Sequence, residues 1–111
     1  MHRKINSYLG GIACGAGLLL CISYPAYAQN QEQLNIRALA ATCANCHGTN
    51  GKAVEGSAVV TLAGVPRDYI VAQMLAFKSG ARPATIMHQI SKGYSDAQIE
   101  QVATYFAAQK R

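Results

Sequence analysis

The chain has 111 residues, which is enough for one domain and not for two. Its formal net charge is +5, with ten Lys and Arg against five Asp and Glu. Part of this excess comes from Arg3 and Lys4, which belong to a segment that we expect to be removed. The basic balance is therefore poor evidence for a nucleic-acid partner, and we expect none.

The first 28 residues have the pattern of a secretory signal peptide. Basic residues at 2–4 precede an apolar run over about 8–22, and residues 26–28 (Ala-Tyr-Ala) form a small-x-small cleavage site. The apolar run is shorter than the roughly 20 residues that a membrane-spanning helix needs. We therefore expect cleavage after Ala28, with a single mature domain over 29–111 in the periplasm and no membrane span. A retained membrane anchor is the alternative.

Helical signals follow one another along the mature chain. A first helix is expected over Glu32–Ala44, with Leu34, Leu39, Ala40 and Cys43 near one face. A Gly-rich loop follows, and Pro66 then opens a helix that carries an apolar stripe and ends at Gly80. The stripe consists of Ile70, Met74 and Phe77.

Two further helices are expected before the C-terminus. A short segment over Thr85–Lys92 ends at Gly93. The last helix starts with a capping box from Ser95 to Gln98, and its buried face is predicted to contain Ile99, Val102, Ala103 and Phe106. No segment alternates long enough to predict a strand, so the domain is expected to be all-α.

A single C-x-x-C-H motif, Cys43-Ala44-Asn45-Cys46-His47, carries the chemistry. This motif is the attachment signature of c-type haem. On a helical turn, two thiols three residues apart can meet the two vinyl groups at one edge of the macrocycle, and His47 can then ligate the iron. Covalent attachment retains the cofactor in a small exported domain. The sequence therefore predicts one covalently attached haem c.

Two other uses of these cysteines stay open. A redox-active Cys43–Cys46 disulfide normally stands at the start of a helix in a βαβ context, whereas this motif follows a helix. A zinc site needs four ligands, usually from two separated pairs. Beside the motif, the mature chain offers only His88.

The opposite face of the iron needs a second ligand or is left open. The candidates in the mature chain are Met74, Met87 and His88. Met74 lies on the apolar stripe of a helix, where methionine is usually core filler. Met87 follows a Pro-broken loop and can approach a haem held between the terminal elements, so we favour it. His88 stays an alternative, since neighbouring side chains diverge by about 100° on a helix.

With Cys43-x-x-Cys46-His47-Gly48 and a late Met87, the chain resembles class I cytochromes c. The segments Leu62-Ala63-Gly64, Arg82 to Met87 and Lys92 to Asp96 are most similar to the haem subunit of flavocytochrome c sulfide dehydrogenase. This resemblance implies four or so helices around one haem. It also implies thioethers at Cys43 and Cys46, with axial ligands at His47 and Met87. In many relatives, Pro stands where this chain has Val60, and a carbonyl in this region accepts the Nδ1–H bond of the histidine.

The expected function is one-electron transfer without catalysis, because two axial ligands leave the iron no place for a substrate. Within that class, the resemblance favours a subunit that accepts electrons from a sulfide-oxidising flavoprotein. A free shuttle between respiratory or photosynthetic complexes is the alternative. A haem enzyme or ligand sensor with a labile second ligand is the third hypothesis.

Overall fold

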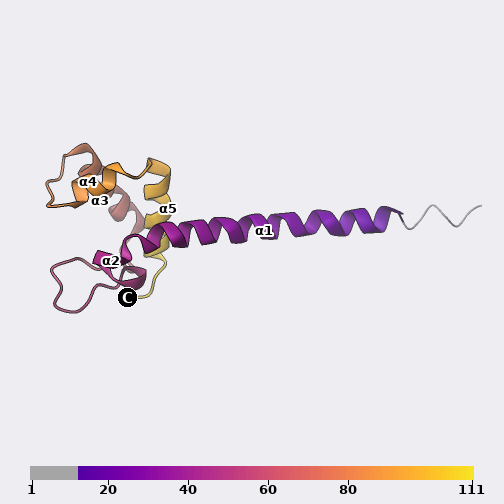
Figure 1. The fold of residues 1–111 in the computed structure, drawn as a ribbon, viewed down its shortest axis with the longest axis horizontal. Helices are drawn as coiled ribbons and strands as arrows, with labels where there is room; N and C mark the ends of the chain where they lie inside the picture. The colour runs from indigo at the N-terminus through magenta and orange to yellow at the C-terminus, as the bar shows by residue number, and fades with distance from the viewer. Residues whose placement is uncertain (1–12) are drawn as a thin grey trace, which may run out of the picture. The chain divides into compact units, whose positions relative to one another are not determined.

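The computed structural model describes residues 13–111, with side chains from Tyr27 onward, so the predicted basic start of the signal peptide lies outside it. The described elements are α1 (Ala13–Ala41), α2 (Ala44–His47), the 3₁₀ helix η1 (Thr49–Gly51), α3 (Arg67–Ser79), α4 (Met87–Lys92) and α5 (Asp96–Ala107) (Figure 1). No strand occurs among these residues, which confirms the all-α prediction. The contacts define a compact unit over Leu34–Arg111.

The first helix differs from the prediction at both ends. In the described residues α1 already begins at Ala13, not at Glu32, and it ends at Ala41. The end has a local cause, because the Thr42 hydroxyl donates to the Leu39 carbonyl at 2.7 Å and replaces the regular ladder. Among the residues predicted near one face of this helix, Ala40 is buried and Leu34 is 51% exposed.

Helices α3 and α4 are each slightly shorter than predicted. Pro66 has ψ of 133° and so precedes α3 as its N-cap, and Gly80 ends the helix in the left-handed conformation with φ of 81°. Helix α4 starts two residues late, at Met87, because Ile86 has φ of −136°. The boundaries are otherwise those expected from the Pro and Gly signals.

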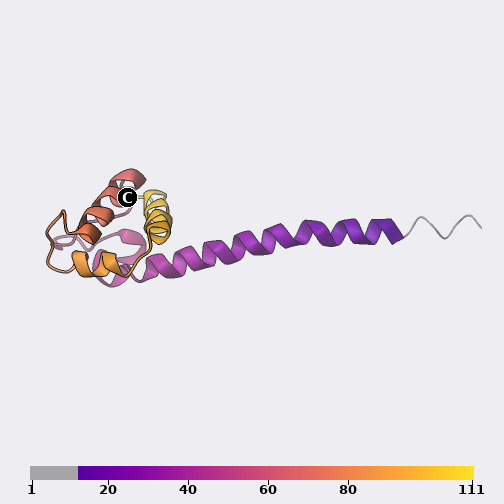
Figure 2. The ribbon, with the colours of Figure 1, turned by 90° about the horizontal axis from the view of Figure 1, so that it is seen from above.

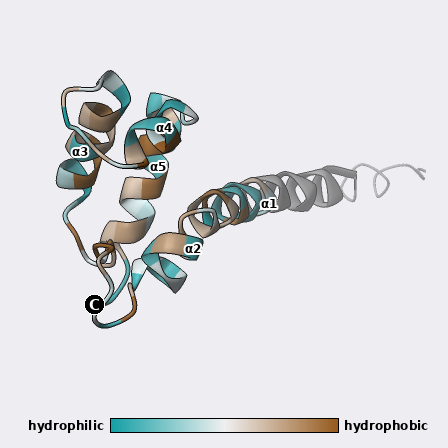
Figure 3. Ribbon diagram, turned by 60° about the vertical axis from the view of Figure 1, so that its left-hand side comes forward, coloured by the Kyte–Doolittle hydropathy of each residue, from teal (hydrophilic) through white to brown (hydrophobic). Residues whose placement is uncertain are grey.

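Helix α5 forms as predicted. The Ser95 hydroxyl accepts a hydrogen bond from the Gln98 amide at 3.2 Å, and the Gln98 side chain accepts one from the Ser95 amide at 2.9 Å. This reciprocal capping box satisfies two donors that a helix start leaves free. Along its length α5 alternates between hydrophobic and hydrophilic residues (Figure 3). Its four predicted core residues, Ile99, Val102, Ala103 and Phe106, are all buried.

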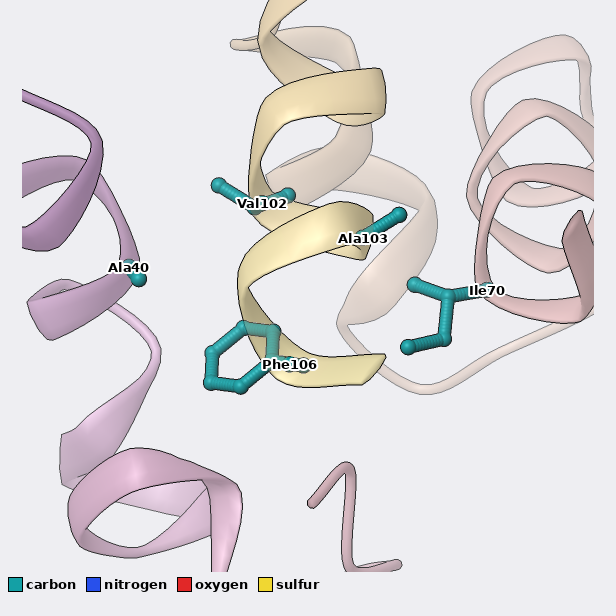
Figure 4. Close-up of a cluster of buried hydrophobic side chains, with 5 residues drawn as sticks. All are labelled: Ala40, Ile70, Val102, Ala103 and Phe106. Carbon is teal, nitrogen blue, oxygen red and sulfur yellow. The ribbon is translucent and has the colours of Figure 1, made fainter. Parts of the chain in front are cut away.

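The core forms around α5. In Figure 4, Val102, Ala103 and Phe106 of α5 lie between Ala40 of α1 and Ile70 of α3. Phe106 is 2% exposed, and burial of a side chain of this kind stabilises a fold by about 1.5–3 kcal/mol. Helix α3 also packs against both α4 and α5 (Figure 2).

Gly51 closes the loop after η1 onto this core. Its carbonyl accepts hydrogen bonds from the amides of Leu62 and Ala63 at 2.8 and 3.1 Å. Its φ is +77°, and a Cβ built there would lie 2.8 Å from Cδ1 of Phe106. The position therefore excludes a side chain on both conformational and steric grounds.

We predict that Gly51→Ala lowers the free energy of unfolding of the holoprotein by about 2–4 kcal/mol, from left-handed strain together with overpacking. Gly56→Ala is the matched control, because Gly56 has φ of +78° with no atom within 4 Å of its Cβ position. Gly56→Ala should lower the free energy of unfolding only through the strain of the left-handed backbone, by about 1 kcal/mol. Denaturant unfolding measures both, and equal losses would contradict the proposed contact with Phe106.

Candidate functional site

The C-x-x-C-H motif folds as one tight helical turn between α1 and η1. The amides of Cys46 and His47 both donate to the Cys43 carbonyl, at 3.3 and 2.9 Å. Residues three apart on such a turn lie on the same side, so the two thiols can address one edge of a ligand. Gly48, at φ of +80°, then reverses the chain, and a Cβ there would lie 1.8 Å from the Lys52 carbonyl oxygen. The turn therefore depends on Gly48.

His47 is oriented by a backbone carbonyl thirteen residues away. Its Nδ1 lies 2.8 Å from the Val60 carbonyl oxygen. Because a carbonyl can only accept, Nδ1 carries the proton and donates it. In the neutral ring the lone pair is then on Nε2, the arrangement that a metal-ligating histidine requires. This confirms the bond expected from the family resemblance, although Val60 replaces the usual proline.

Two hydroxyl groups surround the thiol of Cys43. The Thr42 hydroxyl lies 3.9 Å from the Cys43 sulfur and 2.7 Å from the Tyr94 hydroxyl. The Thr42 hydroxyl has one proton and donates it to the Leu39 carbonyl. In this arrangement the Tyr94 hydroxyl therefore donates to the Thr42 oxygen. Burial raises the pKa of the Cys43 thiol, and the two hydroxyls oppose that rise. No sequence signal points to this pair, because its members are 52 residues apart in the chain.

The three candidates for the second axial ligand occupy different surroundings. Met87 is half-buried and is the first residue of α4. Met74 packs against the core cluster, with its sulfur 3.7 Å from the Ser91 hydroxyl. His88 is half-buried, and its Nδ1 is buried without a hydrogen-bond partner among the described residues. The surroundings of Met74 are those of a core residue.

The two alternative uses of the cysteines gain no support. Cys43 and Cys46 are both free thiols in the structure. Over the residues with described side chains, no three or more His, Cys, Asp or Glu side chains form a group that could hold a metal ion. In the described residues, His88 does not join the motif in such a group.

Comparison with known proteins decides the family. The model of the family described as Cytochrome c matches residues 35–110, which include the whole motif, Met87 and all of α5. The chain belongs to the cytochrome c family. Membership of this family implies a covalently bound haem c and a role in electron transfer.

Similar curated proteins include small cytochromes and subunits of sulfur-oxidising systems. The cytochrome subunit of sulfide dehydrogenase from Chlorobaculum tepidum is 37% identical over 61% of this chain and 60% of its own length. A thiosulfate dehydrogenase electron acceptor from Thiomonas intermedia is 37% identical over 64% of this chain, but over only 33% of its own length. Cytochrome c-553 from Helicobacter pylori is 30% identical over 84% of this chain and 97% of its own length.

The residues of this cytochrome fit the haem that its family implies. Two free thiols stand on one turn, and the adjacent His47 keeps Nε2 available because Nδ1 is bound to Val60. Imidazole and thioether are common axial ligands of cytochrome c iron. Cys43, Cys46 and His47 would therefore hold the haem from one side, and Met87 would supply the second ligand to the iron.

We predict that a double variant, Cys43→Ala with Cys46→Ala, contains no covalent haem. Protein isolated from a host with haem-attachment machinery should be heavier by one haem under denaturing mass spectrometry, and the double variant should show the mass of the polypeptide alone. Each single variant retains one thiol and serves as the control, with partial attachment expected. An unmodified mass for the parent protein would contradict the attachment site.

We predict that Met87→Ala removes the weak far-red sulfur-to-iron charge-transfer band of the oxidised protein and lowers its reduction potential, because the thioether ligand is lost. Met74→Leu and His88→Ala are the controls and should leave the band in place. Loss of the band in Met74→Leu would instead identify Met74, in α3, as the ligand. A band that persists in Met87→Ala would exclude Met87.

Proposed function

We propose that this chain is a periplasmic, mono-haem cytochrome that carries single electrons for a partner protein. Cys43 and Cys46 form the thioethers, and His47 and Met87 are the axial ligands. The observation that carries the proposal is the hydrogen bond from His47 Nδ1–H to the Val60 carbonyl, at 2.8 Å. It fixes the tautomer and the direction of a ligand histidine without any contribution from a substrate.

When bound, the haem supplies an iron that changes oxidation state by one electron. The protein contributes a fixed surrounding, because His47 is held by Val60 and Met87 stands at the start of a helix packed on α3. Three carboxylates of the domain form ion pairs with basic side chains. Asp68 and Glu100 pair with Arg67, and Asp96 pairs with Lys78.

Export of the chain is part of the proposal. The compact unit over Leu34–Arg111 contains all four proposed ligand residues, so cleavage after Ala28 would leave the site intact. No helix in the described part of the chain has both the length and the apolar character to cross a membrane. An exported domain of this size also suits covalent attachment, which prevents loss of the cofactor.

For the partner, we propose a flavoprotein that oxidises sulfide. The similarity to the cytochrome subunit of sulfide dehydrogenase covers 68 residues and supports this assignment. The surface around α4 is suited to docking. Ile86, directly before Met87, is 56% exposed, and Lys92 at the other end of the helix is an exposed cation. Electron-transfer partners use small interfaces of this kind.

Two other cationic side chains that could steer an acidic partner already interact with other residues of the domain. Lys78 donates to the Tyr94 carbonyl at 2.7 Å and to the Asp96 carboxylate at 2.8 Å. The Arg82 guanidinium lies 4.7 Å from the centre of the Phe77 ring and donates to the Gln73 side chain. Lys92 therefore allows a cleaner test of steering than either of them.

A free electron shuttle is the second candidate function. It is favoured by the similarity to cytochrome c-553, which extends over nearly all of that small protein. The two functions differ in one property, since a subunit co-purifies with its donor and a shuttle does not. Co-purification from the native host separates them.

We predict that the isolated holoprotein is reduced by sulfide slowly, and that a flavoprotein co-purified from the native host accelerates the reduction. Lys92→Glu should slow the accelerated reaction several-fold at low salt and much less at high salt, because charges steer the encounter. Stopped-flow spectroscopy of the haem bands measures both rates.

Lys110→Glu is the control, because it makes the same charge change at an exposed residue beyond the C-terminal end of α5, a helix about 18 Å long. It should leave the salt dependence unchanged. Full-rate reduction of the isolated chain by sulfide, or no acceleration by any flavoprotein, would contradict the subunit function and favour the shuttle.

A further inference from the structure

Ser91 is a buried polar residue in an otherwise apolar contact between α3 and α4. It is fully buried and is the only buried polar or charged residue among those with described side chains. A buried polar group is stable only when it is hydrogen-bonded, so its partners are informative. Both partners of Ser91 belong to methionines, and both of these methionines are candidates for the second axial ligand.

The first partner is the backbone of Met87. The Ser91 hydroxyl donates to the Met87 carbonyl at 2.6 Å, across one turn of α4. Helix α4 has only six residues, and its N-cap Ile86 makes no side-chain hydrogen bond. So short a helix is held by its tertiary contacts more than by its own ladder. The hydroxyl therefore tethers the turn that begins with Met87.

The second partner is the sulfur of Met74. Sδ of Met74 lies 3.7 Å from the Ser91 hydroxyl. A hydroxyl has a single proton, and the short distance to the carbonyl shows where that proton is directed. The contact nevertheless keeps the Met74 thioether against α4, where Met74 also packs on the core cluster.

We propose that Ser91 is a positioning residue for the iron site: its hydroxyl holds the first turn of α4 so that Met87 supplies the sulfur ligand, while Met74 stays in the core. Two thioethers are chemically equal as ligands, so the protein must distinguish them by position. The Ser91 hydroxyl contacts both residues. This inference rests on the proposed function, since it takes Met87 as the axial ligand.

The test is Ser91→Ala in the full holoprotein, titrated with imidazole in the oxidised state. Imidazole competes with the protein's own sulfur ligand, so its apparent affinity reports how firmly Met87 is held. Loss of one buried hydrogen bond should raise that affinity by about three- to tenfold and weaken the far-red band. The mass should still include one covalent haem. Alanine is small and helix-favouring, so the variant should fold.

Ser79→Ala is the matched control. Ser79 is exposed, and its hydroxyl makes the same kind of bond to a backbone carbonyl, that of Ala76 at 3.2 Å in α3. Its removal should leave imidazole affinity unchanged. Ser91→Thr retains the hydroxyl and should restore most of the parent affinity, and thermal unfolding of every variant shows whether the fold is kept.

The possible results test the role of Ser91 separately from the assignment of Met87 as the axial ligand. If Ser91→Ala lowers thermal stability but leaves imidazole affinity and the band unchanged, Ser91 has only a structural role and the inference is wrong. The inference is equally wrong if Ser79→Ala has the same effect as Ser91→Ala. If the band survives in Met87→Ala, the ligand assignment itself fails, and that result is obtained without any Ser91 variant.

Discussion

The hydrogen bond between His47 and the Val60 carbonyl is the interaction on which the rest of the site depends. It spans 2.8 Å and joins the helical turn of the motif to the loop before α3. A hydrogen bond of this kind contributes about 1 kcal/mol to stability, so its main effect is orientation. By fixing the proton on Nδ1 it makes Nε2 available, and it aligns the ring relative to the two thiols. The loop itself is held by Gly51, whose carbonyl binds the amides of Leu62 and Ala63.

The proposed site has two sides. One is the turn with Cys43 and Cys46, beside which the hydroxyls of Thr42 and Tyr94 form a pair. The other would be α4, which packs on α3 and carries the bond from the Ser91 hydroxyl to the Met87 carbonyl. Tyr94 lies two residues after the end of α4, and its hydroxyl contacts Thr42 beside the motif. A change in α4 can therefore reach the attachment turn through Tyr94.

Much of the fold follows from local signals in the sequence. Pro66 and Gly80 bound α3, and the capping box of Ser95 starts α5, because these residues act on the backbone beside them. The prediction for α1 was incomplete in two ways. Packing against α5 decides which of its residues are buried, so Ala40 is buried while Leu34 is exposed. The predicted end of the helix lay three residues late, because the bond from the Thr42 hydroxyl to the Leu39 carbonyl was not anticipated. Cys43, Cys46 and His47 were named from the motif, and Met87 from its place after a Pro-broken loop. The roles of Tyr94 and Ser91 needed the arrangement of α3, α4 and α5.

The central claim is that His47 and Met87 hold the iron from its two faces and stay in place during electron transfer. A crystal structure of the holoprotein in both oxidation states tests it most directly. The account predicts Nε2 of His47 and Sδ of Met87 on the iron in both states, with the bond from His47 Nδ1 to the Val60 carbonyl kept. Iron bound by Met74 or His88, or an axial position that loses its protein ligand on reduction, would contradict it.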